Sequence, residues 1–175
     1  MLRAVDLGLL RLLRTRGHGP TVERGLLAYT RTGEHGALWL GLCVVGAAVD
    51  PGRRGLYSVG ARVVALAYLA NIALKYVVRR RRPMLEGLPP LSSTVTGLSY
   101  PSAHSTTSFA AARVLARELP AAPLYAAAAA MALSRTYVGV HYPSDVAAGA
   151  LFGTAIADLL HDGLTRWLSW PQTPT

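Results

Sequence analysis

The chain has 175 residues, of which 51% are hydrophobic and only 15% are charged, and its formal net charge is +9. The length fits one domain with one core, and the mean hydropathy of +0.30 is too high for a typical soluble protein. The arginines lie between apolar runs without the patterned aromatic residues of a stacking platform, which argues against a nucleic-acid-binding protein. A basic membrane protein instead meets anionic lipids or anionic lipid-linked substrates.

The first segment, residues 2–16, has the pattern of an amphipathic helix. Leucine and valine recur at helical spacing on one face, and Arg3, Arg11 and Arg14 lie on the other. The segment is too short to span a bilayer, and Asp6 and Arg11 interrupt any apolar core of a signal peptide. We therefore expect an interfacial helix on an anionic leaflet, with a helix packed on the rest of the protein as the alternative.

Five later segments are apolar enough for membrane-spanning helices. Residues 17–35 are Gly-rich and polar, residues 84–99 form a Pro-, Ser- and Thr-rich loop, and Cys43 is the only cysteine, so no intrachain disulfide can form. We predict a single-domain, all-α, polytopic membrane bundle of about five transmembrane helices plus the N-terminal interfacial helix. The expected spans are 36–49, which residues from about Leu26 could extend, then 56–78, 102–119, 124–137 and 146–168.

With five spans, the N-terminal region 1–35, residues 75–102 and residues 135–145 fall on the same side of the membrane. Six arginines precede the first span, and an excess of arginine is typical of cytoplasmic segments. Arg53 and Arg54, on the opposite side, conflict mildly with this assignment. We expect a multi-pass protein of the inner (plasma) membrane whose polar clusters face the cytoplasm.

Two polar clusters lie between residues 75 and 105. The first pairs Lys75 with Arg82 and the following proline. A charge at the end of a membrane helix is costly unless it reaches head groups or has a partner, so Lys75 is either an anchor or part of a site. The second cluster contains Ser102, a favourable N-cap, and His104. The helix start leaves backbone N–H groups for phosphate oxygens, although a lone histidine there is more often structural.

The third cluster connects two apolar segments with an arginine, a histidine and an aspartate. Arg135 precedes the connection, and Asp145 lies in the first turn of a helix expected to begin at Pro143, which places His141 just outside a helix N-terminus. Such a position attracts anions, so the cluster suggests chemistry on an anionic group. By itself, the spacing of His141 and Asp145 also fits a metal-ligand pair or a simple hydrogen bond.

The order and spacing of the three clusters are more specific than any one of them. Together they read K-x6-RP, then PS-x-H, then SR-x5-H-x3-D, over residues 75–145. This arrangement resembles the type 2 phosphatidic acid phosphatase family. The resemblance implies a helical-bundle membrane enzyme that removes phosphate from lipids without a metal or other cofactor. The sequence departs from the family at Ala103, where glycine is usual, and in having one span fewer than six.

The resemblance also implies a role for each residue of the motif. His141 would be the nucleophile that forms a phosphohistidine, Asp145 would hydrogen-bond its far ring nitrogen, and His104 would protonate the leaving oxygen and then activate water. The chemistry agrees, because fixed cations neutralise a phosphate dianion and a carboxylate makes an imidazole a better nucleophile. The phosphoryl oxygens would be held by Lys75, Arg82, Ser102, Arg135 and the backbone N–H of Ala103.

The remaining arginines of the first motif, Arg79, Arg80 and Arg81, do not stand at its fixed positions. We expect them to form a solvated or head-group-facing patch, or else to bind a second anionic group of the substrate. That substrate would be a polyprenyl-linked phosphate, a polyprenyl diphosphate or a phosphatidate-type lipid. Small size and a composition rich in arginine and alanine resemble actinobacterial members most, which makes decaprenylphosphoryl-5-phosphoribose the leading expectation.

Two other classes of function stay open at this point. A non-enzymatic membrane protein that binds anionic lipids would explain the arginines, but not three further polar residues at the family's spacing. A metal-dependent hydrolase would use the same residues as ligands: His104, His141 and Asp145.

Overall fold

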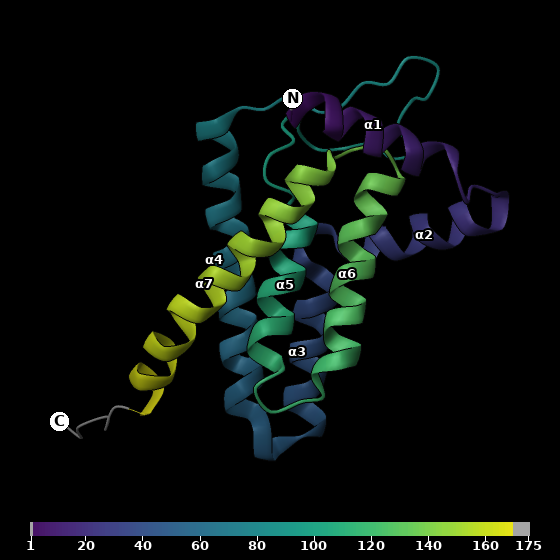
Figure 1. Ribbon diagram of the computed structural model, residues 1–175. Helices are drawn as coiled ribbons and strands as arrows, with labels where there is room; N and C mark the ends of the chain where they lie inside the picture. Colours follow the sequence, from purple (N-terminus) through teal and green to yellow (C-terminus); the bar gives the residue numbers. More distant parts are fainter. Residues whose placement is uncertain (1, 170–175) are drawn as a thin grey trace.

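The computed structural model describes the backbone of residues 2–169 and the side chains of residues 3–160. Within this range the chain is helical, and its only β-bridges are two isolated ones in the loop that follows residue 78 (Figure 1). The all-α prediction is confirmed. The helices are α1 Leu2–Thr15, α2 Pro20–Thr32, η1 Glu34–Gly36, α3 Ala37–Val49, η2 Pro51–Arg53, α4 Arg54–Val78, α5 Ala103–Leu115, α6 Ala121–Tyr137 and α7 Pro143–Ser169.

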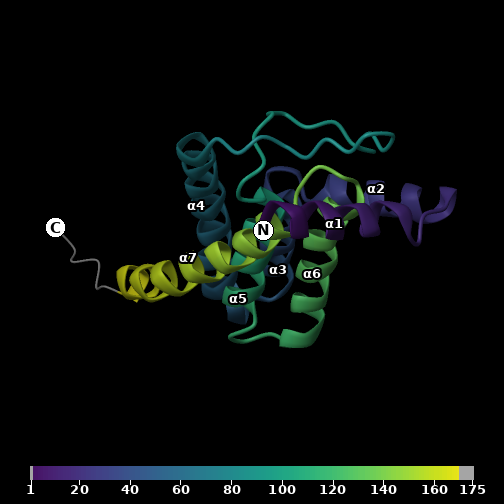
Figure 2. The same cartoon turned by 45° about the horizontal axis from the view of Figure 1, so that its top comes forward.

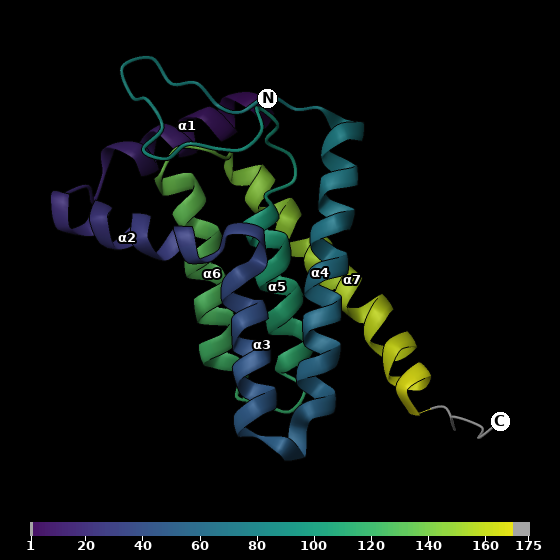
Figure 3. The same cartoon turned by 180° about the vertical axis from the view of Figure 1, so that it is seen from behind.

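Helix α5 lies at the centre of the bundle and packs against α4, α6 and α7. Helices α3 to α6 run side by side, and α7 crosses them obliquely (Figures 1 and 3). The close approach of α7 depends on Gly149 and Gly153, because a Cβ at either position would clash with the backbone of α5. This short distance between helices fixes the start of α7, and with it the connection at 138–142, against the start of α5.

The lengths of the helices leave the number of membrane crossings open. Helix α4 with η2, Pro51–Val78, has 28 residues and is long and apolar enough to cross a bilayer. Helices α2 and α3, taken together, are also long and apolar enough to cross a bilayer, although the chain bends by 52° where they join. Helices α3 and α5 have 13 residues each, about 20 Å of helix against a hydrocarbon core of about 30 Å. The five-span count stays a prediction.

The Gly-rich segment 17–35 contains a helix that the sequence analysis missed. Helix α2 begins at Pro20, a residue favoured in the first helical turn, and ends before Gly33. The chain does not continue straight into α3, because His35 and Gly36 have left-handed φ angles of 54° and 78°. The expected extension of the first span upstream to Leu26 is therefore interrupted by a break at residues 33–36.

Helix α1 is amphipathic, as predicted, but the predicted polar face is divided: Arg3 and Arg11 are exposed, whereas Arg14 is turned inward. Asp6 is 3% exposed, and Leu10 and Arg14 are also buried. Figure 2 shows α1 running across the ends of α6 and α7, which it contacts. The alternative of a helix packed on the bundle is therefore confirmed, and the interfacial position on an anionic leaflet stays a prediction, although α1 presents an apolar face to its surroundings. The outward side chains, which are 36% to 53% exposed, are Val5, Leu9, Leu12 and Leu13.

Ionic and hydrogen-bond contacts attach α1 to the loops at this end of the bundle. The carboxylate of Asp6 accepts hydrogen bonds from Arg80 Nη2 at 2.7 Å and from the backbone N–H of Ser144 at 3.0 Å. Burial of Asp6 opposes ionisation, but these bonds hold the pKa of its carboxyl below the usual value. Arg14 Nη2 donates to the carbonyl of Pro89 at 2.8 Å. The N-terminal helix is therefore fixed to the loop after α4 and to the start of α7.

We predict that Asp6→Ala destabilises the protein by roughly 1–3 kcal/mol, because buried donors of Arg80 and Ser144 lose a charged acceptor. The unfolding midpoint in detergent should fall by several degrees. The matched control is Asp158→Ala, which removes an exposed ion pair to Arg113 at 2.8 Å and should cost less than about 1 kcal/mol. Equal shifts for the two variants would contradict the docking of α1 described above.

Candidate active site

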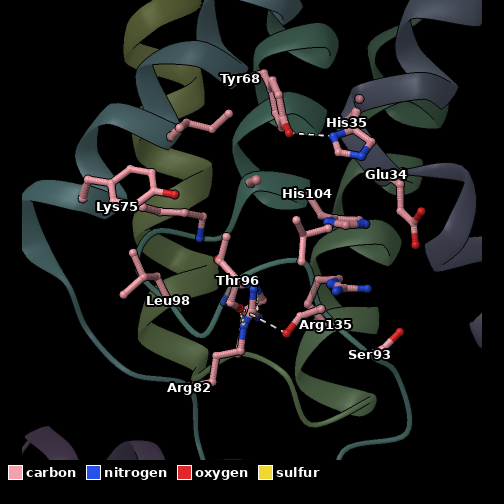
Figure 4. Close-up of a pocket in the computed structure, with 18 residues that line it drawn as sticks. Glu34, His35, Tyr68, Lys75, Arg82, Ser93, Thr96, Leu98, His104 and Arg135 are labelled. Atoms are coloured by element: carbon pink, nitrogen blue, oxygen red, sulfur yellow. Dashed lines mark hydrogen bonds between the residues drawn. The ribbon is translucent and has the colours of Figure 1, made fainter.

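The three polar clusters of the sequence meet at one end of the bundle and line a single cavity of about 280 Å³ (Figure 4). Two of the eight predicted residues, Ser102 and Asp145, lie behind its wall and are completely buried. The other six line the cavity itself: Lys75, Arg82, Ala103, His104, Arg135 and His141.

Lys75 is held at the cavity by the way in which α4 ends. Arg79 adopts a left-handed conformation and its N–H caps the carbonyl of Lys75, which stops the helix. The ammonium group of Lys75 donates to the carbonyls of Pro101 at 2.7 Å and Ser99 at 3.3 Å. The lysine is buried, so it does not extend to head groups as a membrane anchor would.

Arg82 is fixed across the cavity by three contacts. Its Nε donates to the carbonyl of Thr96 at 2.8 Å, and its Nη1 donates to the carbonyl of Val140 at 2.8 Å. The same Nη1 lies 3.1 Å from Nε2 of His141. Burial lowers the pKa of Arg82 to about 10, which leaves the guanidinium charged at neutral pH.

Arg135, in the last turn of α6, supplies a third cation, and it is buried. Its Nη1 donates to Thr30 Oγ1 at 2.6 Å. Its Nε is buried and has no hydrogen-bond partner among the described residues. A buried donor without an acceptor is costly, and a bound phosphate oxygen would satisfy it. Lys75 and Arg82 line the same cavity, so three cations are available to one anion.

His141 lies in the connection between α6 and α7 and is 2% exposed. Because Arg82 can only donate, the contact of its Nη1 makes Nε2 of His141 an acceptor, and the proton of the neutral ring lies on Nδ1. Burial and nearby positive charges lower the pKa of His141 from 6.5 to about 3, although Asp145 acts in the opposite direction. The imidazole is therefore neutral at neutral pH, with the Nε2 lone pair at the cavity wall.

The contact between Asp145 and His141 is less direct than the expected hydrogen bond. Asp145 Oδ2 lies 3.6 Å from His141 Nδ1, an ion-pair distance that is too long for a hydrogen bond. The hydroxyl of Ser99 donates a short hydrogen bond to Oδ2 and lies 3.4 Å from Nδ1. The backbone N–H of Tyr142 also donates to Oδ2, at 2.9 Å. Ser99 was missed in the sequence because a single serine in a Ser-rich loop carries no signal.

Arg80 corrects the prediction of a patch of three free arginines. Its Nη1 donates to Asp145 Oδ1 at 2.8 Å, its Nη2 to Asp6 at 2.7 Å, and its guanidinium lies 4.0 Å from the ring centre of Tyr142. Arg80 is therefore engaged in the support of Asp145, and it is neither a solvated residue nor free for a second anion. Arg80 turns inward because the carboxylates of Asp6 and Asp145 both face it. These two residues are far apart in the sequence, so their proximity could not be predicted from it.

Ser102 caps α5, as predicted, with its hydroxyl accepting from the backbone N–H of Ser105 at 3.5 Å. The capped turn presents Ala103 and His104 to the cavity. Nε2 of His104 donates to the carbonyl of Thr30 at 3.1 Å, so α2, the helix missed in the sequence, positions this histidine.

The break between α2 and α3 forms the remaining wall of the cavity. Glu34 and His35 line it together with Tyr68 of α4 (Figure 4). These residues could not be placed near the motif from the sequence, because the hydropathy pattern does not reveal the break between the two helices.

Comparison with known proteins is consistent with this site. Residues 60–167 match the family model of the PAP2 superfamily. The chain is 43% identical over 133 residues to decaprenylphosphoryl-5-phosphoribose phosphatase of Mycolicibacterium smegmatis, covering 74% of this chain and 72% of the relative. It is 38% identical over 149 residues to the protein of the same name from Mycobacterium tuberculosis, covering 81% and 84%.

The fold also has a solved counterpart. The first transmembrane PAP2 type phosphatidylglycerolphosphate phosphatase from Bacillus subtilis has a TM-score of 0.79 at 22% identity, covering 98% of this chain and 89% of that chain. The two chains thus share a helical-bundle fold. The family match covers more than half of the chain and includes the motif residues from Lys75 to Asp145, and on this basis the chain belongs to the PAP2 superfamily.

Proposed function

We propose that this membrane phosphatase removes the phosphate from decaprenylphosphoryl-5-phosphoribose at the cytoplasmic face of the inner membrane. The observation that carries the proposal is the placement of His141, neutral and buried, between Arg82 on one ring nitrogen and Asp145 on the other. Lys75 and Arg135 complete a cationic cavity around it. The relatives at 38% and 43% identity that bear the name of this activity support the choice of substrate.

In the first step, Nε2 of His141 attacks phosphorus, and a P–N bond forms as the bond to the ribose oxygen breaks. The three cations neutralise the charge on the equatorial oxygens. The proton on Nδ1 stays with the ring, where Asp145 stabilises the positive charge that develops, with Ser99 holding the carboxylate. The neutral form of His141 provides the lone pair that this step requires.

His104, protonated on both ring nitrogens when the dianionic phosphate is bound beside it, gives the proton on Nδ1 to the leaving oxygen of the ribose. Its Nε2 is occupied by the carbonyl of Thr30, so Nδ1 is the ring atom that exchanges this proton. In the second step the deprotonated His104 takes a proton from water, which attacks phosphorus and breaks the P–N bond. Inorganic phosphate leaves, and both histidines return to their starting states. Proton transfer of this kind contributes roughly 100- to 10,000-fold to the rate.

The cytoplasmic orientation is supported by α1. Arg3 and Arg11 of α1, and Arg16 directly after it, are exposed, and α1 lies across the end of the bundle at which α6 ends and α7 begins (Figure 1). Arginine next to membrane segments favours the cytoplasmic side and attracts anionic lipids. The apolar outward face of the same helix suits the membrane interface.

A polyprenyl diphosphate or a phosphatidate-type lipid is the second candidate substrate. Arg79 and Arg81 are exposed beside the motif and would suit a further anionic group. We favour the phosphoribose because Arg80, between them, already serves Asp6 and Asp145.

The substrate is tested with a panel of purified lipids: the lipid-linked phosphoribose, a prenyl diphosphate and phosphatidate. Wild-type protein should release phosphate fastest from the first, and His141→Ala should lose at least about 10,000-fold of that activity, because the nucleophile is absent. His18→Ala, a matched control at the α1–α2 connection, should stay active. A folded His141→Ala variant that still hydrolyses the substrate would overturn the mechanism.

A chelator tests the metal-dependent alternative. Loss of activity with a chelator would favour a metal-dependent hydrolase.

The pH dependence of kcat/KM should be bell-shaped. His141 attacks only when deprotonated, so the acid limb should lie well below pH 6.5, in keeping with its lowered pKa of about 3. The alkaline limb reports loss of the proton that His104 must donate. A profile that is flat from mildly acidic to alkaline pH would contradict the pairing of these two histidines.

The membrane side is tested by cysteine labelling in a Cys43→Ser background. Met84→Cys, at a 90% exposed position in the loop by the cavity, should react with an impermeant maleimide only when the cytoplasmic face is accessible. Glu118→Cys, at the opposite end of the bundle, should show the reverse pattern. If Glu118→Cys instead reacted from the cytoplasmic face and Met84→Cys from the other face, the site would lie outside the cytoplasm.

A further inference from the structure

We propose that the break between α2 and α3 is a subsite for the hydroxyl groups of the substrate's sugar, in which Glu34 selects a sugar phosphate over a diphosphate. This inference rests on the proposed function, because it uses the roles given to His141 and His104. The inference goes beyond the proposed function by assigning substrate specificity to residues outside the phosphatase motif.

The charges in the cavity are separated in space. The cations Lys75, Arg82 and Arg135 lie with His141, whereas Glu34 is the only carboxylate among the described lining residues. Figure 4 shows Glu34 on the far side of Arg135 from Arg82. The carboxylate of Glu34 is near enough to attract the guanidinium of Arg135 electrostatically. It is exposed and forms no ion pair with another described residue, so it is available to a ligand.

The break is held firmly against His104. A Cβ on Gly33 would lie 2.7 Å from His104 Cδ2, so only glycine allows this approach. His35 next to it adopts a left-handed φ of 54°, a conformation that a non-glycine residue keeps only when its surroundings enforce it. One such restraint is the 2.6 Å hydrogen bond between His35 Nδ1 and the hydroxyl of Tyr68. The wall is therefore formed before the substrate arrives.

The direction of the reaction places the leaving group at this wall. In an in-line displacement the leaving oxygen departs opposite to the nucleophile. His141 attacks from one side, and His104 must reach the leaving oxygen on the other. Whatever the oxygen carries then lies beyond His104, and Gly33 and Glu34 are the residues in contact with that region.

The side chains at this wall suit a sugar ring, which is itself neutral and carries hydroxyls, with the prenyl phosphodiester of the lipid-linked substrate on the far side of that ring. A carboxylate accepts hydrogen bonds from sugar hydroxyls, and those bonds to a charged acceptor are strong. The hydroxyl-bearing lining residues of the opposite loop add further partners: Ser93, Thr94 and Thr96. In a diphosphate the leaving group is itself a phosphate, so its negative charge would meet Glu34 and be repelled. A simple alkyl group would leave the carboxylate without a partner.

The test compares Glu34→Gln with wild type on a prenylphosphoryl-5-phosphoribose and on farnesyl diphosphate. Loss of the charged acceptor should lower kcat/KM for the phosphoribose about 10-fold or more. The value for the diphosphate should stay the same or rise, because the repulsion is removed. The matched control is Glu86→Gln, an exposed residue outside the cavity, which should change neither value. Tyr68→Phe should shift the preference in the same direction as Glu34→Gln, by freeing His35.

Two results would overturn the subsite. Equal losses of kcat/KM on both substrates would mean that Glu34 has only a structural role. No change of kcat/KM on either substrate would mean that Glu34 does not contact the sugar. Failure of the proposed function looks different, because wild-type protein would then release phosphate from the diphosphate or phosphatidate but not from the phosphoribose. A wild type that prefers the phosphoribose, with Glu34→Gln unchanged, would contradict the subsite alone.

Discussion

The arrangement of this end of the molecule depends on the burial of one carboxylate. Asp145 is completely shielded from solvent, and a buried charge is tolerated only when it is paired and hydrogen-bonded. Its partners come from separate segments of the chain: Arg80 after α4, Ser99 before α5, and Tyr142 and His141 between α6 and α7. Satisfying this one group holds both ends of the α4–α5 loop against the connection between α6 and α7.

The same network extends to the N-terminus and to the reacting atoms. Arg80 joins Asp145 to Asp6, so α1 is fixed by the residue that pairs with the carboxylate beside His141. On the other side, Arg82 determines which nitrogen of His141 faces the cavity. Burial lowers the pKa of His141 most, and the positive charges placed to bind phosphate lower it further, so both keep the imidazole neutral. The cations thus favour phosphate binding and the nucleophilic form of His141 together.

Much of this could be predicted from the sequence, because the motif residues sit at fixed distances along helices and their ends. The N-cap at Ser102 and the first turn of α7 were predictable from capping preferences. The inward turn of Arg80 and the break at His35 were not, since both depend on contacts between residues far apart in the chain. Helix α1 shows a related limit, because periodicity reveals two faces but does not say which one the bundle covers.

The central claim is that His141 carries the phosphoryl group between the two steps. The most direct measurement is rapid acid-free quenching of the purified protein with a substrate radiolabelled in the phosphate, followed by mapping of the labelled peptide. The account predicts an alkali-stable, acid-labile phosphoenzyme at His141 that is absent from His141→Ala. Label that persists in this variant, or that lies on another residue of the wild type, would contradict it.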